Sequence, residues 1–260
     1  MRIVVNADDF GASAETVAAT IECFEEGALT SATIMPTMPA ADEALAYARD
    51  RPDRSFGVHL TFTGNGDERC AADPGDVPAL VDEAGRFPPA RPVRLRALLR
   101  RLPVAQLERE IAAQISVVKS GGVEISHVDS HRHLHKLAPF QAALRTVLPR
   151  FGIERVRTVQ DVYLSRPLLA ATYWVGPVWR RPLRRSFRTT DHFYMPASTG
   201  DLAWADDLLR RAGELPGDTL EVGVHPGFDG WRDDERRSAR GLSARAGDLG
   251  HELVSWREIG

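Results

Sequence analysis

The run from Ser126 to His135 holds the densest group of side chains that could do chemistry. It reads SHVDSHRHLH and contains four of the eight histidines together with a carboxylate. In a β-strand alternate side chains share a face, so we expect His127, Asp129 and His131 to point the same way. Neutral imidazoles and carboxylates bind divalent metals and serve as general acids and bases. The run therefore predicts a metal site or an acid/base site.

Three more polar groups each follow or end a short apolar run. Asp8 and Asp9 follow the first such run, His59 lies near the end of another, and His225 follows a third. Active sites of parallel α/β folds form at the carboxyl ends of the strands. We therefore expect these residues to converge on one site.

Two imidazoles and one carboxylate, with positions left open for water and substrate, are typical of a catalytic metal site. A second carboxylate could take a proton from water, and a histidine on another strand could protonate a leaving group. Neighbours on a strand face opposite ways, so Asp8 and Asp9 should differ in role, one as ligand and one as base. The sequence has no Gly-x-Ser-x-Gly turn, phosphate loop or dinucleotide fingerprint.

The elements that must position these residues alternate along the chain, which favours parallel pairing with helices outside the sheet. Expected helix caps are Ser13 and Asp201, and a closing helix is expected within 233–260, with Leu249, Leu253 and Trp256 at helical spacing. Strands are predicted over 3–5, 31–35, 56–60, 123–128, 155–159, 189–194 and 220–224, and helices over 14–26, 40–49, 104–120, 140–148 and 202–212.

The length of 260 residues suits one domain with a sizeable core. Residues 61–103 are rich in Gly, Pro and charge, and predict a lid or binding loop with short structure of its own, or else disorder. Residues 163–188 interleave aromatic residues with arginines, from Arg166 to Arg188. They could recognise an anionic lipid, a phosphate or nucleic acid, or they could form a helical excursion with solvated arginines.

The net charge of −3 provides no global field to attract nucleic acid. Cys23 and Cys70 lack the spacing of a thiolate zinc site or a disulfide framework. No signal peptide or transmembrane run is visible, so we expect a soluble, cytoplasmic protein. Whether the chain forms a homo-oligomer stays open.

Five separated motifs resemble those of the YdjC-like carbohydrate deacetylases, which include chitooligosaccharide deacetylases. The motifs are NADDFG at 6–11, TSAT at 30–33, GVHL at 57–60, HVDSHRHLH at 127–135 and HPG at 225–227. The resemblance spans residues 1 to about 230. It implies a single domain over 1–260 with a distorted (β/α) barrel, mostly of parallel strands, related to the polysaccharide deacetylases. Residues 61–103 and 163–188 match none of these motifs, so we expect the substrate to be decided there.

Carried over residue by residue, the resemblance implies a divalent cation and a set of roles. Asp9, His59 and His131 are implied as metal ligands, Asp8 as the base and His225 as the acid. His127, Asp129, His133 and His135 are then expected to orient the ligands or contact substrate. Magnesium is the family expectation, whereas zinc, manganese or cobalt suits a His-His-Asp set better.

The sequence thus predicts a metal-dependent hydrolase that removes an acetyl group from an N-acetylated amino sugar, oligosaccharide or glycoconjugate. The alternatives are a metal-dependent phosphoesterase or other amidohydrolase, and, in another class, a noncatalytic carbohydrate-binding protein. A further hypothesis makes residues 163–188 a membrane-surface handle for a glycolipid substrate.

Overall fold

A computed structural model describes residues 1–66, 68–165, 171–196 and 204–260. Its strands form one seven-stranded sheet in which every pair of neighbouring strands is parallel. In spatial order the strands are β4 (Ile125–Ser130), β3 (Ser55–Leu60), β2 (Ser31–Ile34), β1 (Arg2–Phe10), β6 (Thr219–Val224) and β5 (His192–Tyr194), with β7 (Glu252–Leu253) beside β1.

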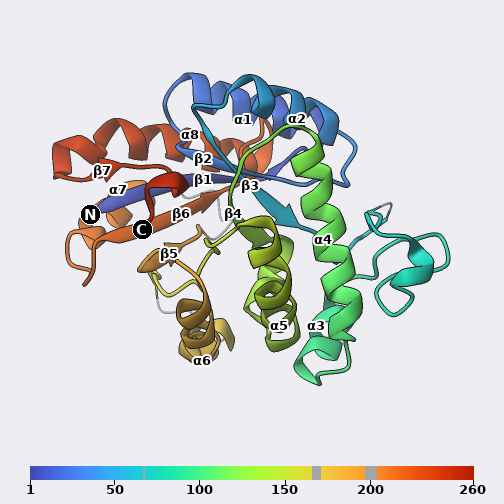
Figure 1. Cartoon of the computed structure of the whole chain (residues 1–260). Helices are drawn as coiled ribbons and strands as arrows, with labels where there is room; N and C mark the ends of the chain where they lie inside the picture. Colours follow the sequence, from blue (N-terminus) through green and yellow to red (C-terminus); the bar gives the residue numbers. More distant parts are fainter. Residues whose placement is uncertain (67, 166–170, 197–203) are drawn as a thin grey trace.

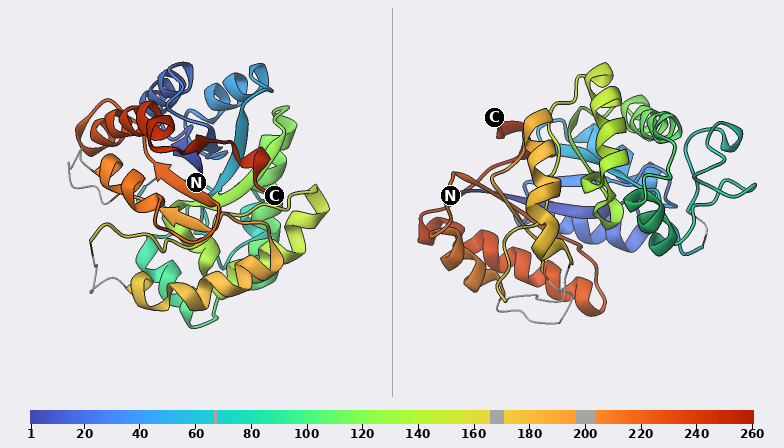
Figure 2. Two further views of the ribbon diagram at one scale, coloured as in Figure 1. Left: turned by 90° about the vertical axis from the view of Figure 1, so that its left-hand side faces the viewer. Right: turned by 90° about the horizontal axis from the view of Figure 1, so that it is seen from below.

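Helices surround this curled sheet (Figure 1, Figure 2). α1, α2 and α8 cover one side, and α4, α5 and α6 lie on the other (Figure 1). The prediction of a parallel barrel with outer helices is therefore confirmed. The helices are α1 (Ala14–Glu25), α2 (Ala41–Asp50), α3 (Ala90–Leu98), α4 (Val104–Ser120), α5 (Ala138–Val147), α6 (Ala171–Ser186), α7 (Trp204–Ala212) and α8 (Gly230–Ala246), and α1 is capped by Ser13 as predicted.

The central strand β1 continues to Phe10, beyond the predicted end at Val5. Its β-branched start is fully buried, and β2 and β6 flank it on both sides, so ladder hydrogen bonds extend the strand past the apolar run. The register with β2 shifts between Ala7 and Phe10. Asp8 and Asp9 consequently lie in an irregular part of the strand rather than beyond it.

The strand predicted over 155–159 is replaced by isolated bridges. Val128 of β4 donates to the carbonyl of Arg155 and accepts from Arg157, whereas Val156 donates to the carbonyl of Arg188 on the other side. Each neighbour is paired through a single bridge, Val128 with Val156 and Arg155 with Arg188, so no continuous ladder forms with either. This segment nevertheless joins β4 to the chain before β5, so it helps to close the barrel.

The closing helix ends earlier than predicted, so Leu249, Leu253 and Trp256 do not belong to it. α8 ends at Ala246, and Gly250, with φ of 73°, follows a short 3-10 turn. The chain then forms β7, and Val254 donates to the carbonyl of Ile3. Trp256 is fully buried and clusters with Val254, Ile259 and Val4 of β1, whereas Leu249 is exposed, so the predicted stripe does not form one helix face.

Two side chains of α4 hold the segment 61–103, which contains a 3-10 turn at Pro74–Asp76 and the helix α3. Glu110 accepts from the backbone amides of Ala71 and Ala72 at 2.9 and 3.0 Å. Gln114 bonds both the amide and the carbonyl of Thr61, at 2.9 and 2.6 Å. The segment is therefore tied to the barrel through α4.

Some predictions fall on residues that the structure does not describe. Asp201, the expected cap of α7, and Arg166 lie outside the described residues. Within the described ranges, no helix combines the length and the apolar character needed to span a bilayer.

Candidate active site

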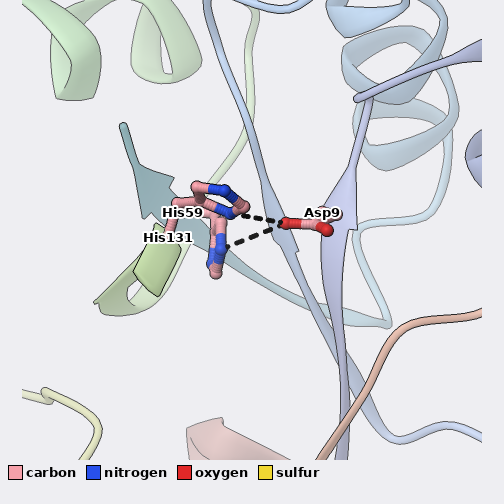
Figure 3. A group of neighbouring side chains, drawn as sticks. All are labelled: Asp9, His59 and His131. Carbon is pink, nitrogen blue, oxygen red and sulfur yellow. Dashed lines mark hydrogen bonds and ion pairs between the residues drawn. The ribbon is translucent and has the colours of Figure 1, made fainter. Parts of the chain in front are cut away.

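Asp9, His59 and His131 come from three elements and meet at one point (Figure 3). Asp9 lies near the end of β1, His59 lies in β3, and His131 opens the 3-10 turn His131–Lys136 that follows β4. Asp9 Oδ1 is 3.3 Å from His59 Nε2 and 3.1 Å from His131 Nδ1. One ligand atom of each residue lies within 4.8 Å of the others.

The ring of His59 is oriented by Asp129. His59 Nδ1 lies 2.7 Å from Asp129 Oδ1, which leaves Nε2 facing Asp9. Thr33 donates to the second Asp129 oxygen at 3.2 Å. Burial opposes protonation of His59, but the charge of Asp129 and hydrogen bonds to Asp129 and Asp9 raise its pKa to about 10. The pocket around this imidazole therefore favours a positive charge at Nε2, either a proton or a cation.

Backbone strain is concentrated at the same place. Asp9, Arg132 and His133 have φ values of 60°, 58° and 54°, in the left-handed region that costs a non-glycine residue about 1–3 kcal/mol. At Asp9 the strain coincides with the shifted register of β1. Asp8 and Asp9 consequently line one cavity together, although neighbours on a regular strand face opposite sides.

Asp8 is held by the fully buried Arg157. The two terminal nitrogens of Arg157 donate to the two oxygens of Asp8 at 2.6 and 2.7 Å. The same guanidinium contacts Asp129 at 2.6 Å and Glu221 at 2.7 Å. Burial alone would raise the pKa of Asp8, but Arg157 lowers it below its ordinary value. Asp8 is therefore ionised at neutral pH.

His225, after β6, has a carboxylate partner on α8. Glu235 Oε2 accepts from the backbone amide of His225 at 2.8 Å and lies 3.1 Å from its Nδ1. Burial lowers the pKa of His225, but the hydrogen bond to Glu235 and the charge of Asp9 outweigh burial, so the pKa is raised. His225 is thus placed as an imidazole that can carry a proton.

A cavity of about 300 Å³ is lined by the predicted ligands, base and acid, which are Asp9, His59, His131, Asp8 and His225. Trp231 and Arg232 of α8 also line it, and Arg232 donates to Asp9 Oδ2 at 2.7 Å. Arg94 reaches it from α3. A larger hollow of about 680 Å³ lies within the segment 61–103 and has no comparable cluster of histidines and carboxylates among its described residues. The candidate catalytic and metal-binding residues therefore lie in the smaller cavity.

The remaining predicted histidines lie at different distances from this cavity. His133 lines it, and His135 lines an adjacent cavity of about 150 Å³ and contacts Ser130 at 2.9 Å. His127 stacks on Trp256 with ring centroids 4.5 Å apart, and its hydrogen bond runs to Ser126. β4 ends at Ser130, so the alternation expected to align His127 with His131 stops before His131.

Sequence reasoning missed Arg157, Glu221, Glu235 and Arg232. One signal was available for Arg157, because it lies in the middle of the predicted strand 155–159, and a charge in a buried strand needs a partner. Glu235 and Arg232 lie in a polar helix in which nothing distinguishes them from solvated neighbours.

The donor set of Asp9, His59 and His131 fits a divalent cation. One carboxylate oxygen and two imidazole nitrogens converge beside an open cavity, as in catalytic rather than structural sites. A second group, of Asp8, His59 and Asp129, is also compact, but Arg157 already places its positive charge between the two carboxylates. The first group is therefore the better candidate.

A model of the YdjC-like protein family matches residues 2–252. The chain is 33% identical over 228 residues to a carbohydrate deacetylase of Geobacillus stearothermophilus, covering 86% of this chain and 79% of that protein. It is 29% identical over 226 residues to a carbohydrate deacetylase of Thermoanaerobacter pseudethanolicus. That match covers 87% of this chain and 81% of the relative.

Two solved structures share the fold. A candidate cellobiose-phosphate cleavage protein of Enterococcus faecalis V583 gives a TM-score of 0.77 at 24% identity, covering 100% of this chain and 98% of that one. A family 4 carbohydrate esterase of Streptomyces lividans in complex with acetate gives a TM-score of 0.51 at 12% identity. The match covers 99% of this chain and 95% of that one. Both likenesses support the distorted barrel predicted from the sequence.

Proposed function

Because the chain belongs to the YdjC-like protein family, we propose that it is a metal-dependent hydrolase that removes an acetyl group from an N-acetylated amino sugar. The sugar is free, part of an oligosaccharide or part of a glycoconjugate. Relatives named carbohydrate deacetylase support the reaction. The observation that carries the proposal is that Asp9, His59 and His131 share one cavity with Asp8 and His225.

Asp9, His59 and His131 would hold the divalent cation. When bound, the cation supplies Lewis acidity toward the acetamide carbonyl and toward water. The two imidazoles favour zinc, manganese or cobalt, whereas magnesium is the expectation from the family resemblance. Arg232, on the second oxygen of Asp9, fixes the direction of that carboxylate.

Asp8 serves as the base that takes a proton from the attacking water. Arg157 keeps it ionised and fixes the plane of its carboxylate through the two parallel hydrogen bonds. Asn6 adds a donor at 2.9 Å to Asp8 Oδ1. These contacts position the base without a conformational search during the reaction.

His225 protonates the amine that leaves the acetyl group. Its raised pKa keeps a proton available near neutral pH, and Glu235 holds Nδ1 so that Nε2 is the nitrogen left to face the cavity.

The substrate sugar is held by residues around the mouth of the cavity. Trp231 is 38% exposed and lines the cavity, so it offers an apolar ring face to a pyranose. Arg94 brings the segment 61–103 to the same mouth. This placement supports one domain over the whole chain, with that segment helping to select the sugar.

Acetate release from N-acetylglucosamine oligomers, measured on chelated protein with and without added Zn²⁺, Co²⁺, Mn²⁺ or Mg²⁺, tests the proposal. Release should require a metal and should fall at least ~10³-fold in Asp9→Asn and His131→Ala. Asp50→Asn, at an exposed carboxylate, is the matched control.

Equal release by Asp9→Asn and the unmodified protein would refute the site. Hydrolysis of a phosphate ester without acetate release would favour a phosphoesterase. Oligomer binding without any turnover would favour a noncatalytic carbohydrate-binding protein.

A further inference from the structure

α3 and α6 expose apolar side chains to solvent on one side of the molecule. Both helices contact α5, and Figure 1 draws them at the lower edge of the molecule on either side of it. Leu98 of α3 is 58% exposed and Val178 of α6 is 71% exposed. Single exposed apolar residues are common, but several that lie together are characteristic of interaction surfaces.

The outward stripe of α6 changes from apolar to basic along its length. Trp174, Val178, Arg181 and Arg185 follow one another at intervals of three or four residues, so they share one helix face, and all are exposed. The opposite face carries Leu183, which is fully buried. The stripe is therefore an outer surface and not a part of the core.

α3 repeats this combination. Leu95 and Leu98 point outward, as does Leu99 just beyond the helix, whereas Val93 and Ala97 are buried. The arginines that surround the three leucines are Arg91, Arg94, Arg96, Arg100 and Arg101. We call the exposed residues of the two helices together the α3–α6 face. Its apolar members are Leu95, Leu98, Leu99, Trp174 and Val178, and its basic members are the arginines beside them.

The charged residues of this face are all basic. The sequence has no Asp or Glu from 84 to 107 or from 162 to 190, although the chain as a whole carries −3. On α6, Arg180 and Arg184 pair with Asp161 and Asp191, which lie outside these stretches. Arg181 and Arg185 have no carboxylate partner among the described residues. Within the described part of the chain, their charge is therefore not paired.

We propose that the α3–α6 face docks this protein on the surface of an anionic lipid bilayer. Tryptophan and leucine side chains partition into the boundary between headgroups and acyl chains, and arginines next to them reach lipid phosphates. Each basic residue near an anionic leaflet strengthens binding further. A second copy of this chain fits poorly, because a symmetric contact would bring the two arginine sets together.

Docking in this way brings the candidate active site close to the membrane. Arg94 belongs to α3 and also lines the cavity that holds Asp9 and His131. The cavity mouth would then lie near the headgroups. On the proposed function, which this step rests on, the substrate class is an N-acetylated amino sugar attached to a lipid.

Vesicle cosedimentation of the full chain tests the docking without needing activity. The unmodified protein should sediment with phosphatidylcholine vesicles containing about 30% phosphatidylserine, and added salt should weaken binding. Arg181→Glu with Arg185→Glu should lower the partition coefficient about tenfold or more. Leu98→Ser with Val178→Ser should weaken binding at unchanged charge. Circular dichroism should show that both variants remain folded.

The matched control is Arg49→Glu with Arg211→Glu, which makes the same charge change at exposed arginines on α2 and α7. Its binding should stay within twofold of the unmodified protein. The proposal is overturned if the unmodified protein does not sediment, or if the control loses as much as Arg181→Glu with Arg185→Glu. It is also overturned if heparin binds as tightly as vesicles while Leu98→Ser with Val178→Ser changes nothing, which would indicate a soluble polyanion. Acetate release is measured separately, so a failure of the proposed reaction cannot be mistaken for a failure of docking.

Discussion

Arg157 donates to both carboxylate oxygens of Asp8, at 2.6 and 2.7 Å, and the two side chains are almost completely shielded from solvent. Arg157→Lys keeps the charge but loses the planar fork that matches a carboxylate. We expect acetate release to fall about 10²-fold, because the base is no longer held in one orientation. Stability should fall by up to about 3 kcal/mol, since Asp8, Asp129 and Glu221 would be left with one smaller cation.

Steady-state kinetics and urea unfolding measure the two effects. Arg155→Lys is the control, because the Arg155 side chain donates to backbone carbonyls, those of Ile259 and Arg257, and not to a carboxylate among the described residues. An Arg157→Lys protein with full activity would remove Arg157 from the positioning of the base.

Glu235 and His225 predict a change in the pH profile. Glu235 contributes to the raised pKa of His225, so Glu235→Gln should lower that pKa. An acid must be protonated to act, so the rate falls as pH rises through its pKa. The alkaline limb of kcat/KM should therefore move to lower pH in Glu235→Gln.

The pH profile of Glu214→Gln, which changes an exposed glutamate, should match that of the unmodified protein. An alkaline limb that stays in place in Glu235→Gln would mean that His225 is not the acid.

Asp129 orients His59 without joining the proposed ligand group. Asp129→Asn should weaken cation binding by about 10–100-fold, the usual effect of losing a carboxylate behind a ligating imidazole. Excess cation should restore part of the activity of Asp129→Asn. It should restore none in Asp9→Asn, which lacks the ligand itself. Titration calorimetry and metal-dependent rates distinguish the two variants, and identical behaviour would place Asp129 among the ligands.

Glu110 ties the segment 61–103 to α4. Glu110→Ala leaves the amides of Ala71 and Ala72 without their acceptor, which should cost about 2 kcal/mol. We expect faster proteolysis within 64–86 and a lower melting temperature. Glu108→Ala, one position outside the buried stripe of the same helix, serves as the control. Equal protease resistance of Glu110→Ala and the unmodified protein would show that the segment is held by other contacts.

Much of the fold and of the candidate site could be predicted from the sequence, because strands that alternate with helices along the chain pair in parallel. Alternating apolar runs and helical stripes implied parallel strands, and parallel strands bring His59 and His131 to the edge where Asp9 lies near the end of β1. Partners fixed only by tertiary packing could not be predicted. Arg157 meets Asp8 across the barrel, and Glu235 meets His225 from a helix whose sequence is mostly polar. The roles assigned to these residues in catalysis, and the cytoplasmic location, stay predictions.

The way Glu110 and Gln114 hold the segment 61–103 has a further consequence. Both anchors sit one turn apart on α4 and bond backbone groups of Thr61, Ala71 and Ala72, so these hydrogen bonds do not depend on the side chains at those three positions. A segment taken from a relative would therefore keep these backbone anchors, provided that it also supplies the apolar side chains that Phe62, Phe87 and Val93 place in the core. On the proposed function, chimeras of this kind would test whether the segment selects the sugar.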